Sequence, residues 1–241
     1  MSYLGDTLRK DGIVRIPKYC RTYVMRRARE YLATKPVYNS HAKVQSDQIP
    51  MPLEDAMIHH PVLCHDMVDV LNAPGILEYA LQQVPLVKEY LGDDPVLYSL
   101  NAFYTMPIGN QIKGDIQAYH RDADDPKGFL ALFLFGTTID RRDEGAHMYL
   151  AGTHLGADNG DEREVTGQAG TAFLADPTGL HMGIKPKSIP RMIFWVRWGR
   201  SDRPAAYDGD KLAEYGAPHR LQDRSLLNDE GTRRMLRLVA V

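Results

Sequence analysis

The spacing of apolar residues changes near residue 96, and this change divides the chain into two unlike parts. Residues 1–95 show mainly helical spacing. The stretch "PKYCRTYVMRRAREYLATK" predicts a helix that opens at Pro17, because its apolar residues recur at three- to five-residue intervals at Tyr19, Tyr23, Ala28 and Leu32. Two further helices are expected within residues 54–71 and 74–91.

Residues 96–200 instead contain short runs rich in aromatic and β-branched residues, separated by Gly, Pro, Asp and Asn. These runs read "VLYSLNAFYTM", "DIQAYH", "FLALFLFGTTI", "AHMYLAG", "GTAFLAD" and "RMIFWVRWG". Several short strands at close spacing predict an antiparallel sandwich or barrel, not a parallel sheet with crossover helices. We therefore predict one mainly β domain over 1–241, with a helical flank at 1–95, a β core at 96–200 and a C-terminal extension at 201–241.

Composition narrows the class of partner. The chain has 241 residues, of which 44% are hydrophobic and 25% charged, and this balance allows a sizeable core. A net charge of −2 gives no bulk attraction for nucleic acid or anionic membranes, so a small molecule is the expected partner. No apolar run is long enough for a signal or membrane segment, and Cys20 and Cys64 lie too far apart for a thiolate metal site. A cytoplasmic location is expected, and the oligomeric state is not indicated.

Candidate chemistry starts at "QAYHRDADD", where His120 and Asp122 are separated by one residue. Nine histidines and 31 acidic residues among 241 predict about one His-x-acid triplet by chance (9 × 31/241 ≈ 1.2), so the triplet alone indicates nothing. On a strand the two side chains would share a face. A metal site needs a third ligand, and His181, 59 residues after Asp122, is the best candidate.

An arginine follows this histidine. If the run ending at His181 pairs as a hairpin with "RMIFWVRWG" around residues 185–187, positions that sum to 372 face one another, and Arg191 is expected opposite His181. Two neutral imidazoles and one carboxylate on one face of a metal leave coordination positions open, as in non-haem Fe(II) oxygenases. Arginine suits a distal carboxylate. The set predicts Fe(II), 2-oxoglutarate and O₂ as cofactor and co-substrates.

The order of these motifs resembles the phytanoyl-CoA dioxygenase-like family of Fe(II)/2-oxoglutarate-dependent oxygenases. The similarity includes "LRKDGIVRIP", "EGAHMYLAGTH" and a Gly-x-x-x-hydrophobic segment before the distal histidine, and it extends to about Gly199. It implies a double-stranded β-helix, the jelly-roll core shared with cupins. It also implies that His120, Asp122 and His181 bind iron, that Arg191 binds 2-oxoglutarate, and that an aliphatic C–H is hydroxylated with release of succinate and CO₂.

One position departs from the family pattern. The small polar residue often found two after the distal histidine is Gly183 here, so a hydroxyl contact to the co-substrate is expected from Thr137 or Thr138. The substrate is expected to be a small polar or acid-bearing metabolite. The residues predicted to line its pocket are Tyr104, Gln117, His147, Trp195 and Arg197.

Alternatives remain open at this level. The same three ligands would hold zinc or manganese in a cupin-like hydrolase or isomerase without redox chemistry. A ligand-binding protein of this fold without turnover is a third alternative. The spacing of Arg191 and Arg197 also resembles the nucleic-acid demethylases of the superfamily, although the chain shows no basic run interleaved with aromatics. Arg197 itself is either a buried ion-pair partner or a binder of a substrate acid group.

Overall fold

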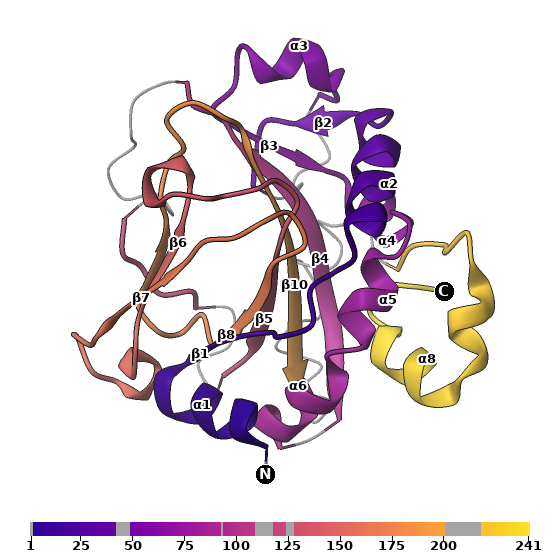
Figure 1. Ribbon diagram of the computed structural model, residues 1–241. Helices are drawn as coiled ribbons and strands as arrows, with labels where there is room; N and C mark the ends of the chain where they lie inside the picture. The colour runs from indigo at the N-terminus through magenta and orange to yellow at the C-terminus, as the bar shows by residue number, and fades with distance from the viewer. Residues whose placement is uncertain (1, 42–48, 93, 109–117, 124–127, 201–217) are drawn as a thin grey trace.

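Two antiparallel sheets form the centre of the protein (Figure 1). The computed structural model describes residues 2–41, 49–92, 94–108, 118–123, 128–200 and 218–241. The larger sheet has seven strands in the order β1-β8-β5-β10-β4-β3-β2, and the smaller has three in the order β7-β6-β9. The strands are β1 Ile13–Arg15, β2 Val37–Tyr38, β3 Val62–His65, β4 Pro95–Thr105, β5 Leu130–Phe135, β6 His147–Leu150, β7 Glu162–Val165, β8 Ala172–Ala175, β9 His181–Gly183 and β10 Arg191–Arg200.

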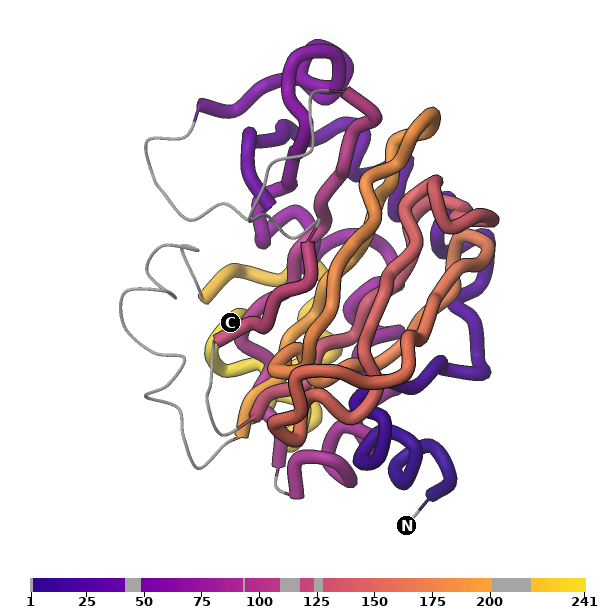
Figure 2. Tube along the Cα trace, turned by 90° about the vertical axis from the view of Figure 1, so that its left-hand side faces the viewer, coloured from indigo at the N-terminus to yellow at the C-terminus, as the bar shows by residue number. Residues whose placement is uncertain are grey.

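Helices cover one face of the larger sheet. In Figure 1, α2, α4, α5 and α8 lie on the side of β4 opposite to β6 and β7. Figure 2 shows α1 and α6 together at one end of the molecule, where Arg9 pairs with Glu89 at 3.2 Å. The helices are α1 Tyr3–Asp11, α2 Thr22–Ala33, α3 Leu53–Met57, α4 Met67–Leu71, α5 Ile76–Leu81, α6 Val84–Leu91 and α8 Glu230–Leu236, with short 3₁₀ turns at Arg142–Glu144, Thr153–Leu155 and Arg224–Asn228.

Alternation along β10 gives the larger sheet two different faces. Phe194, Val196 and Trp198 are buried in the core against the helices. Ile193 and Trp195 point the other way, into a second apolar cluster between the two sheets. β10 is paired on both edges, with β4 and with β5. Because the two clusters also cover both of its faces, the run is apolar at most positions. The space between the sheets is where a site can form.

The first 95 residues do more than flank the core. Besides the helices of the predicted, mainly helical flank, they contribute β1, β2 and β3 to the larger sheet. The helix expected to open at Pro17 begins at Thr22, and residues 17–21 instead run alongside β8 with Cys20 N donating to Gly170 O at 2.9 Å. The predicted antiparallel β core itself is confirmed.

Two expectations drawn from composition can be compared with the described chain. Cys20 and Cys64 are both buried, and within the described residues the group that could hold a metal contains neither of them. Within the described ranges, no helix has the length and apolar character needed to cross a bilayer. Half of the strand expected at "DIQAYH", residues 115–117, lies outside the described residues, and residues 118–120 form no strand beyond an isolated bridge at His120.

His65 gives the fold a testable pH dependence. It is fully buried at the end of β3, with Nδ1 3.1 Å from Pro36 O, and burial lowers its pKa from 6.5 to about 4. The unfolded chain therefore takes up the proton first, so stability is complete above pH 6.5 and falls as the pH drops toward 4. We expect His65→Gln to remove about 3 kcal/mol of this loss, measured by denaturant unfolding at pH 7 and pH 4. An equal pH dependence in both proteins would contradict the assignment.

Candidate metal centre and arginine pocket

Backbone pairing brings the predicted ligands together from two segments. His181 opens β9, and His120 forms an isolated antiparallel bridge with it, each amide donating to the other's carbonyl at 3.0 Å. Asp122 N donates to Pro177 O at 2.8 Å. His120 and Asp122 thus lie on an irregular segment and not on the strand that the sequence predicted. They nevertheless face the same point, because the bridge fixes one side chain and the bond to Pro177 fixes the other.

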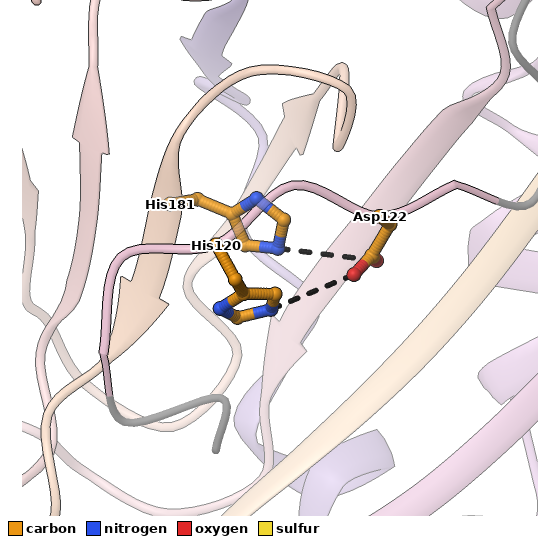
Figure 3. A group of neighbouring side chains, drawn as sticks. All are labelled: His120, Asp122 and His181. Carbon is orange, nitrogen blue, oxygen red and sulfur yellow. Dashed lines mark ion pairs between the residues drawn. The ribbon is translucent and has the colours of Figure 1, made fainter. Parts of the chain in front are cut away.

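The three side chains converge as a compact group (Figure 3). The Nε2 atom of His120 lies 3.5 Å from one Asp122 carboxylate oxygen, and that of His181 lies 3.9 Å from the other. On the far side of each ring, Nδ1 lies near the carbonyl two residues earlier, 2.8 Å for Ala118 and 2.9 Å for Gly179. These carbonyls can only accept, so Nδ1 carries the proton and a neutral imidazole turns its Nε2 lone pair toward the carboxylate.

The protonation states of these three side chains favour the binding of a cation. Burial lowers the pKa of His181, and the Asp122 carboxylate opposes this only in part, so the imidazole is neutral at pH 7. Burial alone would raise the pKa of Asp122, but the neighbouring His120 and His181 outweigh it and the pKa is lowered. Two nitrogen lone pairs and a carboxylate pointing at one another form a donor set suited to a divalent metal ion.

Arg121 is a supporting residue that the sequence analysis missed. Its side chain turns away from its two neighbours and donates to the carbonyls of Thr153 at 2.6 Å, Thr178 at 2.8 Å and Ala157 at 2.6 Å. Three charge-assisted bonds to separate loops hold the segment that carries the ligands. Only its position between His120 and Asp122 could have indicated this role, since arginines are common in the chain.

Arg191 reaches the same pocket by a route that differs from the prediction. The expected hairpin between β9 and β10 is wrong: β9 pairs with β6 in the smaller sheet, and β10 pairs with β4 and β5 in the larger one. The chain changes sheet twice here, because β8 and β10 lie in the larger sheet and β9 lies in the smaller one. Arg191 therefore approaches Gly183 face to face across the gap between the sheets, and not edge to edge.

The guanidinium of Arg191 is buried, and the described residues provide no counter-ion for it. It is 3% exposed, and Nη1 donates to Gly145 O at 3.1 Å. No carboxylate of the described residues lies within ion-pair distance, and Nε finds no hydrogen-bond partner there. Burial lowers the pKa of Arg191 to about 10, so the group remains charged at pH 7. A buried cation with open donors is expected to bind an anion.

Aromatic side chains form much of the remaining wall of the pocket. Besides the three ligands and Arg191, the pocket is lined by Phe103, Phe133, Ile193 and Trp195, with His147 on the opposite sheet. The predicted Trp195 and His147 therefore lie at the pocket. Phe103 was missed.

Two of the predicted residues do not face the pocket, and a third cannot be placed. Tyr104 was assigned to the wrong face of β4: it packs in the helix-side core, while its neighbour Phe103 takes the inner position. Thr138 is exposed on the turn after β5, where its hydroxyl contacts Gln168, so the expected co-substrate contact is not supported. The hydroxyl of Thr137 accepts from Met192 N at 3.0 Å. Gln117 lies outside the described residues.

Arg197 has a structural environment. It is 5% exposed, its Nη2 donates to Ser99 Oγ at 2.9 Å, and its guanidinium carbon lies 4.1 Å from the centre of the Trp195 ring. Tyr98 covers it at 5.3 Å. The guanidinium thus packs on the Trp195 ring, and its charge helps to lower the pKa of the Asp122 carboxyl. Arg197 is not among the described residues that line the pocket, and its contact with a substrate stays a prediction.

Comparison with known proteins places the fold. No family model and no curated protein matches the sequence. Solved structures do match: the non-heme alpha ketoglutarate dependent epimerase SnoN from nogalamycin biosynthesis has a TM-score of 0.58 at 14% identity, over 82% of this chain and 81% of that one. The corresponding carbocyclase SnoK gives 0.58 at 14% identity, over 83% and 85%. HygX from Streptomyces hygroscopicus, with nickel, 2-oxoglutarate and hygromycin B bound, gives 0.58 at 12% identity, over 83% and 88%.

Identities this low establish shape and not activity. The matches nevertheless cover most of each chain, and they bear out the predicted jelly roll. The described chain carries its His-x-Asp and distal His at one compact centre between these sheets. The protein therefore has the double-stranded β-helix fold of the non-heme, 2-oxoglutarate-dependent enzymes.

Proposed function

We propose that this protein is an Fe(II)- and 2-oxoglutarate-dependent dioxygenase that hydroxylates an aliphatic C–H of a small molecule. The observation that carries the proposal is the pairing of two features in one pocket. One is a donor set of two imidazole lone pairs and a carboxylate, and the other is a buried guanidinium for which the described part of the chain supplies no counter-ion. A divalent metal satisfies the first, and a carboxylate at the far end of a metal-bound ligand satisfies the second.

The residues present fit the metal. His120 and His181 both present Nε2, and Asp122 presents one oxygen to each ring. Three protein ligands on one side leave the other positions for exogenous ligands, which suits Fe(II) better than a closed structural zinc site. The solved relatives support the choice, since SnoN was obtained with Fe³⁺ and alpha ketoglutarate and HygX with nickel and 2-oxoglutarate.

The residues present also fit the co-substrate. Arg191 would bind its distal carboxylate, because the guanidinium is already desolvated and its donors are pre-oriented by the bond to Gly145 O. Gly183 makes this placement possible. A Cβ at that position would lie 2.5 Å from Nη1 and 2.6 Å from Nη2 of Arg191, closer than non-bonded atoms approach.

The chain's own part in the reaction is orientation and exclusion. Iron with 2-oxoglutarate and O₂ supplies the oxidising chemistry, yielding succinate and CO₂. His120, Asp122 and His181 fix which metal positions stay open. Asp122 would fill the metal position that a halogenase of this superfamily leaves for chloride, which favours hydroxylation. The aromatic wall of Phe103, Phe133 and Trp195 keeps water from the centre and favours an apolar part of the substrate there.

The residues that line the pocket also indicate which part of the substrate lies near the metal. Phe103, Phe133, Ile193 and Trp195 form the apolar part of the described lining, and Arg191 is the arginine among the described lining residues. We therefore place any polar or acid-bearing part of the substrate away from the metal. SnoN and HygX were solved with the natural products nogalamycin RO and hygromycin B. Molecules that combine an apolar carbon near the metal with distal polar groups are the first candidates to screen.

A non-redox cupin-like hydrolase or isomerase is the alternative, because the same ligands would hold zinc or manganese. Metal analysis of protein purified without oxygen, followed by a succinate assay in air with Fe(II) and 2-oxoglutarate, separates the two. We expect bound iron and succinate formation that depends on both additions. Zinc or manganese at full occupancy with no succinate would contradict the oxygenase assignment.

Gly183→Ala tests whether the close approach of the Arg191 guanidinium to Gly183 is needed for binding of 2-oxoglutarate. The added methyl group would force the Arg191 guanidinium to move, and we expect affinity for 2-oxoglutarate to fall about tenfold, the cost of weakening one charge-assisted hydrogen bond. Metal affinity should stay within twofold, because Gly183 touches none of the three ligand atoms. The measurement is a titration of the co-substrate into metal-loaded protein without oxygen. Unchanged affinity for 2-oxoglutarate would place its carboxylate elsewhere.

A further inference from the structure

His147 carries a buried polar atom that the assigned roles leave unused. It is the first residue of β6, it is 3% exposed, and its side chain points into the space between the sheets. Its Nε2 atom has no hydrogen-bond partner in the described parts of the chain. Buried polar atoms in folded proteins are nearly always paired, so an unpaired one in a pocket indicates a missing ligand.

The strand register fixes what lies beside it. β6 pairs with β9 so that His147 is opposite Gly183, while Tyr149 is opposite His181. The guanidinium of Arg191 occupies the space over Gly183 where a side chain would otherwise be. His147 therefore stands next to Arg191 on the wall of the pocket, with its ring 5.7 Å from that of His181.

The side chains packed against His147 indicate which kind of ligand could pair with its Nε2 atom. Phe133 and Phe173 pack against the ring at 4.8 and 4.7 Å, and neither offers a strong hydrogen-bond acceptor. The metal-ligand group of the described residues consists of His120, Asp122 and His181 and does not include His147. A guanidinium has donors only, so the group that can satisfy both Arg191 and an imidazole N–H is an acceptor-only anion.

We propose that His147 is a second anchor for the distal carboxylate of the 2-oxo acid co-substrate, with its Nε2–H donating to the oxygen that Arg191 does not saturate. The proposal rests on the proposed function. The proposal also accounts for the glycine at position 183. A hydroxyl side chain there would point at the same carboxylate, and His147, which is opposite Gly183 on the neighbouring strand β6, supplies the hydrogen-bond donor in its place. His147 is thus a positioning residue that selects five-carbon dicarboxylic 2-oxo acids over monocarboxylic ones.

The test is calorimetric titration of 2-oxoglutarate into Mn(II)-loaded protein without oxygen. We expect His147→Leu to weaken binding about tenfold or more, the loss of one hydrogen bond to a charged group. Binding of 2-oxopentanoate, which lacks the distal carboxylate, should change less than twofold. His147→Gln, which keeps an N–H donor, should recover part of the affinity. Met148→Leu, at the next and equally buried position of β6, is the control and should match the wild type.

A second readout separates binding from packing. Because leucine leaves no unpaired polar atom, the metal-free His147→Leu protein should melt at or above the wild-type temperature. A melting temperature well below the wild type, or equal weakening toward both 2-oxo acids, would make His147 structural and overturn the proposal, as would unchanged affinity for 2-oxoglutarate. If the wild type itself binds neither acid in the presence of metal, the proposed function fails first, and this outcome is distinct.

Discussion

Asp122→Ala is expected to abolish succinate formation and to lower the affinity for Fe(II) by more than about 100-fold. Even the loss of an outer partner of a metal ligand costs about 10- to 100-fold, and Asp122 is the single anionic member of the three-residue group. Without it, two neutral imidazoles remain to hold a dication in a largely apolar pocket. The measurements are metal content after dialysis against a weak chelator and succinate release in air.

The control for this prediction is Asp158→Ala. Asp158 is fully exposed, and its ion pair with Arg121, at 3.6 Å, lies at the surface. Its removal should therefore leave metal content and succinate release within twofold of the wild type. Asp122→Ala protein that still holds iron at wild-type affinity would show that the His-Asp-His group is not the metal centre.

Arg191→Met is expected to raise the KM for 2-oxoglutarate by about 100-fold or more. A bidentate contact between a guanidinium and a carboxylate contains two charge-assisted hydrogen bonds, each contributing about 1.5–3 kcal/mol. Two such bonds correspond to at least about 100-fold in affinity. Methionine keeps most of the apolar stem of the side chain. It also removes a buried charge that has no counter-ion among the described residues, so folding should not suffer.

A co-substrate analogue without the distal carboxylate provides the control for Arg191→Met. Use of 2-oxopentanoate should be equally poor in the wild type and in Arg191→Met, because this acid has no distal carboxylate to lose. Arg163→Met, at an arginine that pairs on the surface with Asp11 at 3.2 Å, should behave as the wild type. A normal KM for 2-oxoglutarate in Arg191→Met would mean that the buried guanidinium serves the fold alone.

The sequence was sufficient to predict which residues form the site, but not which strands and sheets bring them together. His120, Asp122, His181 and Arg191 were identified by residue type and order, which reflect the chemistry of the pocket. The hairpin that was expected to join the last two does not exist, since β9 and β10 lie in different sheets. Periodicity reports which face of a strand is buried, whereas both faces of β10 are buried, so no local pattern could assign its partner.

The same limit explains the error at Tyr104. β4 is buried at every position, so the alternation that normally marks the inner face is absent from its sequence. Phe103 and Tyr104 are both aromatic, and only the register of β4 against β10, with Phe103 opposite Ile193, decides which of them faces the metal. Arg121 was missed for another reason: its role depends on carbonyls from loops 32, 36 and 57 residues away.

The most direct test of the central claim is the visible absorption of the protein when Fe(II) and then 2-oxoglutarate are added without oxygen. Chelation of iron by the 2-oxo acid at His120, Asp122 and His181 is expected to give a weak charge-transfer band. The band should be absent with Zn(II) and absent in Asp122→Ala. If folded, iron-loaded wild-type protein gives no band when 2-oxoglutarate is added, the result contradicts the assignment.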